Sequence, residues 1–521
     1  MPQEIDINLS PQQANNEQDI KSVIARKLRI NPKTISFVNH LRRSIDARSK
    51  QVKIRLKVEV FINEEPGDTK KQIEYKDVNS SKSIIIVGAG PAGLFAALGL
   101  IERGLKPIII ERGKKISDRK KDIAQLYRSL QINPDSNYCF GEGGAGTYSD
   151  GKLYTRSSKR GNVRKILEIF VAHGGHPDIL IDAHPHLGTN KLSGIITNIR
   201  ETIINAGGEF HFESRVTDFI IHQEKILGVI DQNGKEYFGA STILASGHSA
   251  RDIYYLLNDK GISIEAKDFA AGVRIEHPQK LINTIQYHSK EKDPLLPTAS
   301  YSLVTQVKDK GVFSFCMCPG GIIVPAATAN NELVVNGMSN AQRNSPYANS
   351  GIVVSIKQNE LIKYRKHGIF AGLEYQKDLE KMAFVTGGNN QQAPAQRMVD
   401  YVQKRMSKKL PKTSYILGVV NAPLHELLPQ NINEPLRRAF KDFDRKMRGY
   451  YSEEAIILGV ESRTSSPIRI PRDKVSLEHI QIKNLYPCGE GAGYAGGIVS
   501  SAMDGENIAA RISEKAVSGG L

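Results

Sequence analysis

Residues 83–93 read Ser-Ile-Ile-Ile-Val-Gly-Ala-Gly-Pro-Ala-Gly, and this stretch decides the fold. The apolar run 84–87 is typical of a buried parallel strand, and the apolar segment 94–103 is typical of a helix that packs on it. The glycines between them have the spacing of a dinucleotide-binding turn. A strand, a glycine-rich turn and a helix in this order predict the first unit of a doubly wound α/β domain.

Each residue of this turn has an expected role. Gly88 is expected to make the tight turn, and Gly90 to let the backbone approach a diphosphate. Gly93 is expected to let the helix pack closely on the strand. Pro91 and Ala92 lie in the first turn of the helix, whose N-terminus would face the phosphates. We therefore expect all five residues to belong to a cofactor site.

A second strand is predicted over residues 106–110, and it ends at Glu111, 23 residues after Gly88. An acidic residue at this place is suited to accept hydrogen bonds from the ribose hydroxyls of an adenosine. The next residue, Arg112, has two open interpretations. It could neutralise a phosphate or lie over the adenine, or it could be an ordinary surface arginine.

Two further glycine clusters indicate FAD rather than NAD. The segment 139–153 (CFGEGGAGTYSDGKL) suits a backbone that lies against an isoalloxazine ring and a diphosphate, where side chains would clash. The segment 485–498 (LYPCGEGAGYAGGI) precedes a predicted helix whose N-terminus can point at the flavin. Glu490 is the expected acceptor for the ribityl hydroxyls. The other residues of this segment that we expect at the cofactor are Gly489, Gly496, Gly497 and Ile498.

Seven motifs carry a resemblance to a known family. They are GAGPAG (88–93), CFGEGGAGTYSDGKL (139–153), LASGHSARD (244–252), GVRIEHP (272–278), FCMCPGG (315–321), GVESRTSSPIRI (459–470) and LYPCGEGAGYAGGI (485–498). With them the chain resembles the FAD-dependent oxidoreductases of the glutathione-reductase-like superfamily and, more closely, a bacterial family of FAD-dependent (NAD/FAD-utilising) dehydrogenases. The resemblance covers nearly the whole chain and implies the fold and the FAD cofactor, but not the substrate.

The resemblance also implies further cofactor contacts. Gly144, Gly146 and Thr147 match the loop beside the flavin. Val216 matches the strand whose backbone meets the adenine, with an ordinary core valine as the alternative. Ser246 and Gly247 match the segment under the diphosphate, where Ser246 replaces the usual threonine and keeps its hydroxyl.

The predicted fold class is α/β, with a discontinuous Rossmann-type FAD domain, an inserted sheet-rich α+β domain and a small β-α-β-β module. The expected segments are a ferredoxin-like module (1–80), the first part of the FAD domain (83–265), the inserted substrate domain (266–475) and the return to the FAD domain (476–521). Within the module, alternating apolar and charged residues predict a strand over 51–62, and helical spacing predicts a helix over 16–28. The polar segment 76–82 is the expected linker.

The expected chemistry is hydride transfer at flavin N5, with a small-molecule substrate held by the inserted domain. Arg274 and Glu276 share one face of a predicted strand, so they could bind an anionic substrate and move a proton; a structural salt bridge is the alternative. The adjacent His277 is a third catalytic candidate. Arg463 lies in the hydroxyl-rich segment 461–466 and is the expected anchor for a substrate or the flavin.

Two other groups of reactive side chains carry weaker signals. His173, His176, His184 and His186 lie close in sequence, but glycines and prolines separate them, so we predict no metal site. Cys316 and Cys318 would point the same way on a strand. Two interpretations remain open: a redox-active pair, or two buried thiols that pack as small hydrophobic side chains.

Composition limits the remaining choices. The 521 residues are 40% hydrophobic and 24% charged, with a net charge of +16, which excludes disorder and membrane embedding. No apolar run is long enough to span a bilayer, no secretory signal is visible, and four cysteines cannot make a disulfide framework, so a cytoplasmic protein is expected. The basic stretch 26–57 could be a solvated face or an anion-binding surface.

Three functions remain open from the sequence. The first is an FAD-dependent dehydrogenase or reductase. Because no second strand-glycine-helix unit occurs, its electrons would come from the substrate, from a transiently bound nicotinamide nucleotide or from a redox protein. The second is an RNA-modifying flavoenzyme that uses the basic module and the basic helix over 437–448. The third is a flavin-binding sensor or scaffold without turnover.

Overall fold

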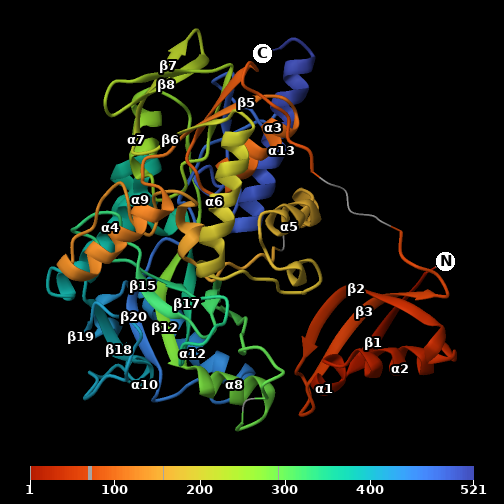
Figure 1. Ribbon diagram of the computed structural model, residues 1–521. Coiled ribbons are helices and arrows are strands. Elements are labelled where there is room, and N and C mark those ends of the chain that lie inside the picture. Colours follow the sequence, from red (N-terminus) through yellow and green to blue (C-terminus); the bar gives the residue numbers. More distant parts are fainter. Residues whose placement is uncertain (1, 68–72, 156–157, 292, 521) are drawn as a thin grey trace.

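The computed structural model describes residues 2–67, 73–155, 158–291 and 293–520, and it confirms the predicted fold class. A five-stranded parallel sheet, a seven-stranded mixed sheet and a separate three-stranded sheet near the N-terminus form the three parts (Figure 1). We call them the parallel-sheet domain, the mixed-sheet domain and the N-terminal module. Within the described ranges, no helix is both long enough and apolar enough to cross a membrane.

The parallel-sheet domain has the strand order β22-β10-β4-β5-β6, with all neighbours parallel. Its strands are β4 (Ser83–Val87), β5 (Lys106–Ile110), β6 (Glu209–His211), β10 (Ser241–Leu244) and β22 (Leu485–Pro487). Four isoleucine and valine side chains of β4 are buried, as expected for a strand covered on both faces. The C-terminal strand β22 lies beside β10, so the last part of the chain completes this sheet.

Helices cover both faces of the parallel sheet. They are α3 (Pro91–Glu102), α5 (Val163–Ala172), α6 (Thr189–Asn205), α7 (Arg251–Asp259) and α13 (Ile498–Val517). The helix α4 (Ile116–Ser129) instead places Ile123 and Leu126 in a cluster with Val324 and Ala326 of the mixed-sheet domain. The glycines of α3 and α13 let these two helices pack closely, because a Cβ on Gly505 would lie 2.0 Å from the carbonyl oxygen of Ala92. A small antiparallel sheet extends from this domain and consists of β7 (Val216–His222), β8 (Lys225–Asp231) and β9 (Glu236–Phe238).

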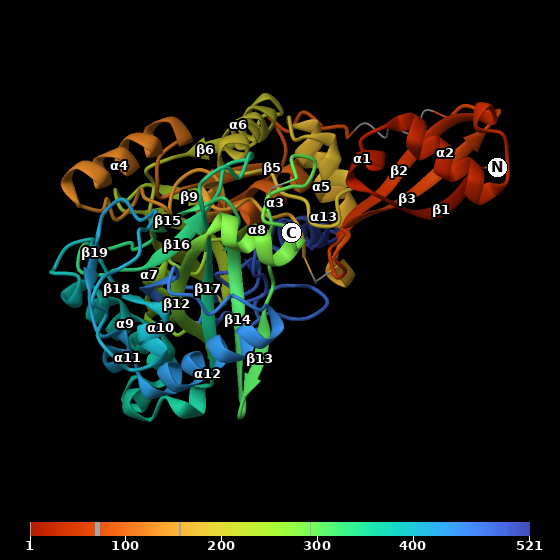
Figure 2. The same ribbon diagram turned by 90° about the horizontal axis from the view of Figure 1, so that it is seen from below.

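The mixed-sheet domain has the order β13-β14-β17-β12-β20-β18-β19. Its strands are β12 (Phe269–Pro278), β13 (Val304–Val307), β14 (Lys310–Cys318), β17 (Tyr347–Ile356), β18 (Ala393–Arg397), β19 (Val419–Asn421) and β20 (Ile456–Glu461). The helices around it are α8 (Gln279–Tyr287), α9 (Ala371–Thr386), α10 (Met398–Val402), α11 (Leu424–Leu427) and α12 (Gln430–Lys446) (Figure 2). Two short pairs complete it, β15 (Ile322–Pro325) with β16 (Val335–Met338), and β11 (Glu265–Ala266) with β21 (Ile468–Arg469).

The N-terminal module is the predicted β-α-β-β unit. It consists of β1 (Gln3–Leu9), α1 (Pro11–Ala14), α2 (Glu17–Leu28), β2 (Ile35–Asp46) and β3 (Lys53–Ile62), with β3 in the middle of the sheet. The Asn16 side chain accepts hydrogen bonds from the backbone N–H groups of Gln18 and Asp19, which is the N-cap that starts α2. The alternation in β3 buries one face against the helices and leaves its lysines and arginine on the other face.

This module contacts both other parts of the chain. The Arg43 guanidinium on the edge strand β2 bridges Asp178 and Asp182, each at 2.7 Å, and its backbone joins the same loop. Leu296 of the mixed-sheet domain is buried in the core of the module. The expected linker 76–82 is also docked rather than free, because Val78 is fully buried against the parallel-sheet domain.

Candidate functional site

The first glycine turn sits against the end of β10. Gly88 has a φ of +106°, and a Cβ there would lie 2.5 Å from the carbonyl oxygen of Ala245 and 3.4 Å from Cα of Ser246. A Cβ on Gly93 would lie 2.0 Å from the carbonyl oxygen of Gly88. The backbone therefore requires glycine at both positions. Ser246 lies next to the turn, and its expected place under the diphosphate stays a prediction.

The second glycine cluster packs directly on the first. Gly144 has a φ of +58°, and a Cβ there would lie 3.1 Å from Cα of Gly90. A Cβ on Gly146 would lie 3.3 Å from side-chain atoms of both Pro91 and Ile498, the first residues of α3 and α13. The starts of two helices from opposite ends of the chain therefore flank one glycine.

The third glycine cluster packs against the start of α3 and against the segment after β10. A Cβ on Gly489 would lie 2.9 Å from Cβ of Ala92, and a Cβ on Gly491 would lie 2.7 Å from the carbonyl oxygen of Gly247. By contrast, a Cβ on Gly247, Gly496 or Gly497 would meet no atom within 4 Å. The glycines thus leave room beside their backbone at the start of α13.

Neither helix that starts here has a side-chain cap. The N-caps of α3 and α13 are Gly90 and Gly497, which offer no side-chain acceptor to the free N–H groups of the first turn. Such N–H groups and the helix dipole favour an anionic ligand. Glycine-lined backbone, space beside it and two uncapped helix starts together fit the diphosphate and ring of FAD.

Glu111 joins the first two glycine clusters. Its Oε2 accepts a hydrogen bond from the Ala89 N–H at 2.8 Å, and its Oε1 accepts from the N–H groups of Gly113 and Gly141, each at 2.9 Å. The buried carboxylate therefore fixes the two loops relative to each other. Its expected contact with ribose hydroxyls stays a prediction.

Arg112 is held by the protein itself. Its guanidinium pairs with Asp135 at 2.7 Å and Asp252 at 3.1 Å and lies 4.0 Å from the centre of the Phe140 ring. Its charge is already balanced, which gives no support to the interpretation that it neutralises a phosphate. Thr147 is similarly engaged, since its hydroxyl donates to the Glu142 carbonyl at 3.1 Å and shapes the glycine loop. Val216 is the buried first residue of β7 and packs in a hydrophobic cluster.

Two residues beside these loops were not predicted from the sequence. Arg119 on α4 is fully buried and donates to the carbonyl oxygens of Asn137 and Glu142, both at 2.8 Å. These two hydrogen bonds fix the backbone at the start of the glycine loop. His248 follows Gly247 and lies between Glu490, 3.3 Å away, and the carbonyl oxygen of Arg463, 3.0 Å away. Its position inside the motif LASGHSARD was the signal available for it.

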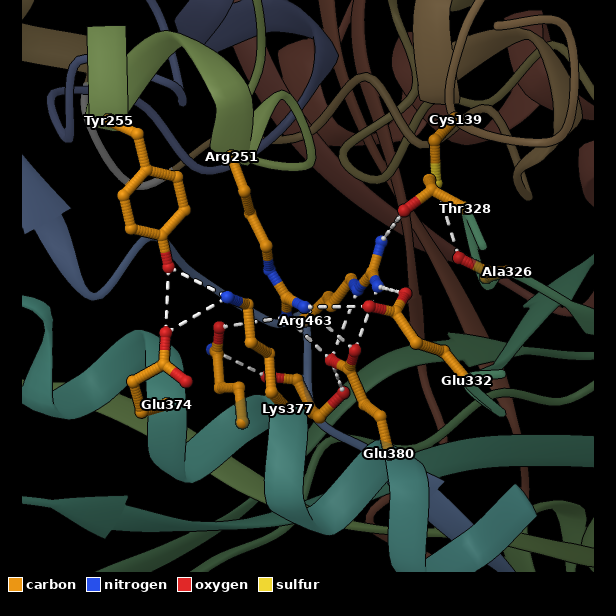
Figure 3. Close-up of polar contacts among 12 residues, drawn as sticks. Cys139, Arg251, Tyr255, Ala326, Thr328, Glu332, Glu374, Lys377, Glu380 and Arg463 are labelled. Carbon is orange, nitrogen blue, oxygen red and sulfur yellow. Dashed lines mark hydrogen bonds and ion pairs between the residues drawn. The ribbon is translucent and has the colours of Figure 1, made fainter. Parts of the chain in front are cut away.

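Arg463 belongs to a buried ionic network rather than to an open anchor site (Figure 3). Its guanidinium contacts Glu380 at 2.8 Å, Glu332 at 2.5 Å and the Thr328 hydroxyl at 2.8 Å. Arg251 of α7 binds the same two carboxylates. Burial alone would raise the pKa of Glu380, but the two guanidinium groups outweigh it and hold this pKa well below its usual value. The network therefore ties the parallel-sheet domain to α9.

The expected pair of Arg274 and Glu276 is not formed. Arg274 is fully buried and pairs with Glu461 at 3.0 Å, and it also contacts the Asn349 side chain. Glu276 instead accepts a hydrogen bond from the Ser414 N–H at 2.8 Å and another from the Ser414 hydroxyl. The two side chains share a strand as predicted, but Arg274 pairs with Glu461, whereas Glu276 bonds to Ser414.

His277 lies in the core of the mixed-sheet domain. Its Nε2 contacts the Tyr450 carbonyl oxygen at 2.9 Å, and its ring centre lies 4.6 Å from that of Tyr450. Burial lowers the pKa of His277 to about 4, so the ring is neutral at pH 7. These contacts describe a packed core histidine.

The cysteines and histidines do not assemble as pairs or clusters. A bulge in β14 separates the two thiols of the FCMCPGG motif, so that Cys316 is exposed and Cys318 is buried. Burial raises the pKa of the Cys318 thiol, which disfavours its thiolate. The four histidines of 173–186 each contact different groups, and the described residues contain no cluster of three or more metal-ligating side chains.

Comparisons with known proteins agree with the cofactor prediction. Residues 81–133 match an FAD binding domain, residues 268–464 match the family described as FAD-dependent protein, C-terminal domain-like, and residues 1–61 match a domain of unknown function. An uncharacterized protein of Clostridium beijerinckii is 40% identical over an alignment of 529 positions, gaps included, that covers 98% of each chain.

Similar solved structures are more distant. A variant of the halogenase PltM in complex with FAD has a TM-score of 0.41 and 10% identity, over 84% of this chain and 70% of that one. A geranylgeranyl bacteriochlorophyll reductase-like protein of Thermoplasma acidophilum has a TM-score of 0.36 and 12% identity, over 84% and 80% of the two chains.

Proposed function

The chain belongs to the same family as the Clostridium beijerinckii protein and binds FAD, and from this premise we propose that it is an FAD-dependent oxidoreductase. The proposal rests mainly on the position of Gly146, whose backbone lies against the first residues of both α3 and α13. FAD bound here would supply hydride transfer at N5. The finer assignments, a dehydrogenase and a member of the glutathione-reductase-like superfamily, rest on the sequence motifs.

The residues of the mixed-sheet domain would hold a small-molecule substrate over the flavin. The FCMCPGG motif on β14 supports this, because Cys316 is exposed and Lys152, at the end of the glycine loop, donates a hydrogen bond to the Met317 carbonyl oxygen. Arg274 and Glu461 would act as positioning residues, since their paired charges are buried behind this motif. The described cysteines are all free thiols, which supports a reducing compartment such as the cytoplasm.

Anaerobic reduction of the purified protein tests the proposal. NADH, NADPH and a panel of small hydroxy and amino acids are added separately, and the loss of flavin absorbance is followed. An oxidoreductase is expected to be reduced by at least one compound at a rate that saturates with its concentration. Full FAD content with no reduction by any compound would instead support a sensor or scaffold.

A second candidate, an RNA-modifying flavoenzyme, has one supporting observation. A hollow of about 250 Å³ on the open sheet face of the N-terminal module is lined by Arg42, Arg55 and Lys57, together with Ser44 and Asp6. The basic helix α12 supports it less, because Arg438 pairs with Glu434 and Arg445 with Asp442. The test is transfer-RNA binding at two salt concentrations, since phosphate contacts weaken with salt. Salt-dependent binding that persists without residues 1–80 would contradict a role for the module.

A further inference from the structure

A second hollow, of about 330 Å³, lies on the mixed-sheet domain beside α8. Its ten lining residues come from α8, from the loop that follows it and from the segment 343–345, and all ten are polar. Pockets for small apolar or aromatic ligands are mostly lined by apolar side chains. This hollow therefore suits a polar ligand, and the aliphatic parts of the lining side chains are also exposed in it.

The charged side chains that line the hollow are all basic. Lys280, Lys290 and Arg343 line it, and among the described residues of its lining none is acidic. Arg343 is balanced by the buried carboxylate of Asp150, which its Nε reaches at 3.1 Å. For the ammonium groups of Lys280 and Lys290, the described part of the chain supplies no hydrogen bond or ion pair. Two positive charges are therefore left over, which matches the charge of a phosphate monoester near pH 7.

Two neutral donors around the hollow are also unused. Within the described ranges, no acceptor contacts the Asn283 Nδ2 group or the Thr284 hydroxyl. The Asn283 Oδ1 atom, by contrast, already accepts from Gln279 at 2.9 Å and from the Ala299 N–H at 3.0 Å. Free donors without free carboxylates favour a ligand that mainly accepts hydrogen bonds, as phosphate oxygens do.

The hollow shares its walls with the loops near the proposed flavin site. Arg343 holds Asp150, which lies in the glycine-rich segment 139–153. Gln279, another lining residue, accepts a hydrogen bond from the Gly320 N–H at 2.7 Å, within the FCMCPGG motif. A ligand in the hollow would therefore touch side chains that hold both motifs in place.

We propose that this hollow is a binding site for a small hydroxyl-bearing organic phosphate, with Lys280 and Lys290 as the phosphate ligands. The inference goes beyond the proposed oxidoreductase activity and does not need electron transfer. The phosphate group is the chemistry shared by a free phosphate ion and an organic phosphate. Among the described lining residues none is aromatic, so no side chain offers a stacking surface for a nucleobase, which favours a sugar-like body.

Calorimetric titration of the full-length, FAD-loaded protein tests the site. Ribose 5-phosphate, inorganic phosphate and ribose are the three probes, at constant ionic strength. Ribose 5-phosphate is expected to bind and ribose is not. Inorganic phosphate binding as tightly as ribose 5-phosphate would overturn the organic-phosphate assignment, and equal binding of ribose would overturn the whole proposal.

Matched variants locate the binding. The double variant Lys280→Gln, Lys290→Gln is expected to raise the Kd for ribose 5-phosphate at least tenfold. The control Lys363→Gln, Lys366→Gln makes the same change of charge at two exposed lysines elsewhere in this domain and is expected to leave the Kd unchanged within twofold. Because all four lysines are exposed, both variants are expected to fold, which flavin absorbance verifies. An equal Kd in both double variants would show non-specific attraction and overturn the proposal.

Discussion

His248 Nδ1 lies 3.3 Å from Oε2 of Glu490, and the other ring nitrogen of His248 contacts the carbonyl oxygen of Arg463 at 3.0 Å. The histidine follows β10, the glutamate follows β22, and the arginine follows β20. One imidazole ring thus connects both halves of the parallel-sheet domain with the residues that follow β20 of the mixed-sheet domain. Its orientation depends on an acidic residue that is predicted to lie at the ribityl chain.

Glu490→Gln is expected to weaken FAD retention roughly tenfold, about 1.4 kcal/mol, because it removes the charged partner of His248 and the expected acceptor for ribityl hydroxyls. Fluorescence of released flavin during dialysis measures this. Glu514→Gln is the control, since Glu514 is exposed on α13 and pairs only with Arg511 in the described chain. Equal flavin loss from both variants would contradict the placement of Glu490 at the cofactor.

Gly144→Ala is expected to reduce FAD affinity by tenfold or more. Its φ of +58° is costly for alanine, and the added Cβ would press on Cα of Gly90 at 3.1 Å. Gly194→Ala on α6 is the matched control, because its Cβ would meet no atom within 4 Å. Flavin content after purification measures both. Full flavin content in Gly144→Ala would argue against a cofactor between these two loops.

Glu380→Gln is expected to destabilise the fold by about 3–5 kcal/mol at pH 7, because two buried guanidinium groups lose their shared carboxylate. The lowered pKa of Glu380 means that its contribution is present above the ordinary pKa of about 4.5 and is lost as the pH falls below it. Urea unfolding at pH 7 and at pH 4 should therefore show a larger difference between wild type and variant at pH 7. A difference that grows at pH 4 would contradict this assignment.

His277 is expected to make the protein less stable in acid. Its pKa of about 4 lies below the usual 6.5, so the unfolded chain binds a proton in this interval and the folded chain does not. Stability should therefore fall by roughly 3 kcal/mol from this group as the pH drops from 6.5 to 4. In His277→Phe, unfolding measured across this range should have a correspondingly shallower pH dependence. The same slope in both proteins would contradict the burial of a neutral ring.

Arg43→Ala is expected to loosen the contact between the N-terminal module and the loop at Asp178 and Asp182. Both ion pairs are partly exposed, so each contributes less than about 1 kcal/mol. Hydrogen exchange at Ala183, whose N–H bonds the Arg43 carbonyl, should become several times faster. Arg48→Ala, which removes only a pair within the module, should leave exchange at Ala183 unchanged.

Local signals allowed much of the fold to be predicted. The strand β4, the glycine turn and α3 follow from neighbouring residues, since the apolar run and the glycine spacing act within a few residues of each other. The cap at Asn16 and the alternation in β3 are local in the same sense. The cofactor could be predicted because a backbone that must approach a ligand closely needs glycine, and clusters of glycine are visible in the sequence.

The partners of buried charges could not be predicted. Arg274 and Glu276 lie two residues apart on one strand, yet Arg274 pairs with Glu461 on the adjacent strand β20. Which carboxylate meets which guanidinium depends on how distant elements pack, and strand spacing carries no information on that. The bulge that separates Cys316 from Cys318 is a similar case, because it reverses the alternation on which the prediction relied.

The position of β22 and α13 has a consequence for the order of events during synthesis. β10 pairs with β22, and α3 packs against Gly505, so the cofactor domain lacks a strand and a helix until residues 485–517 have left the ribosome. The whole mixed-sheet domain is translated before that moment and can fold first. Capture of FAD therefore has to wait for the synthesis of β22 and α13, and a ribosome that stalls before them leaves a flavin-free chain with the apolar side of α3 uncovered.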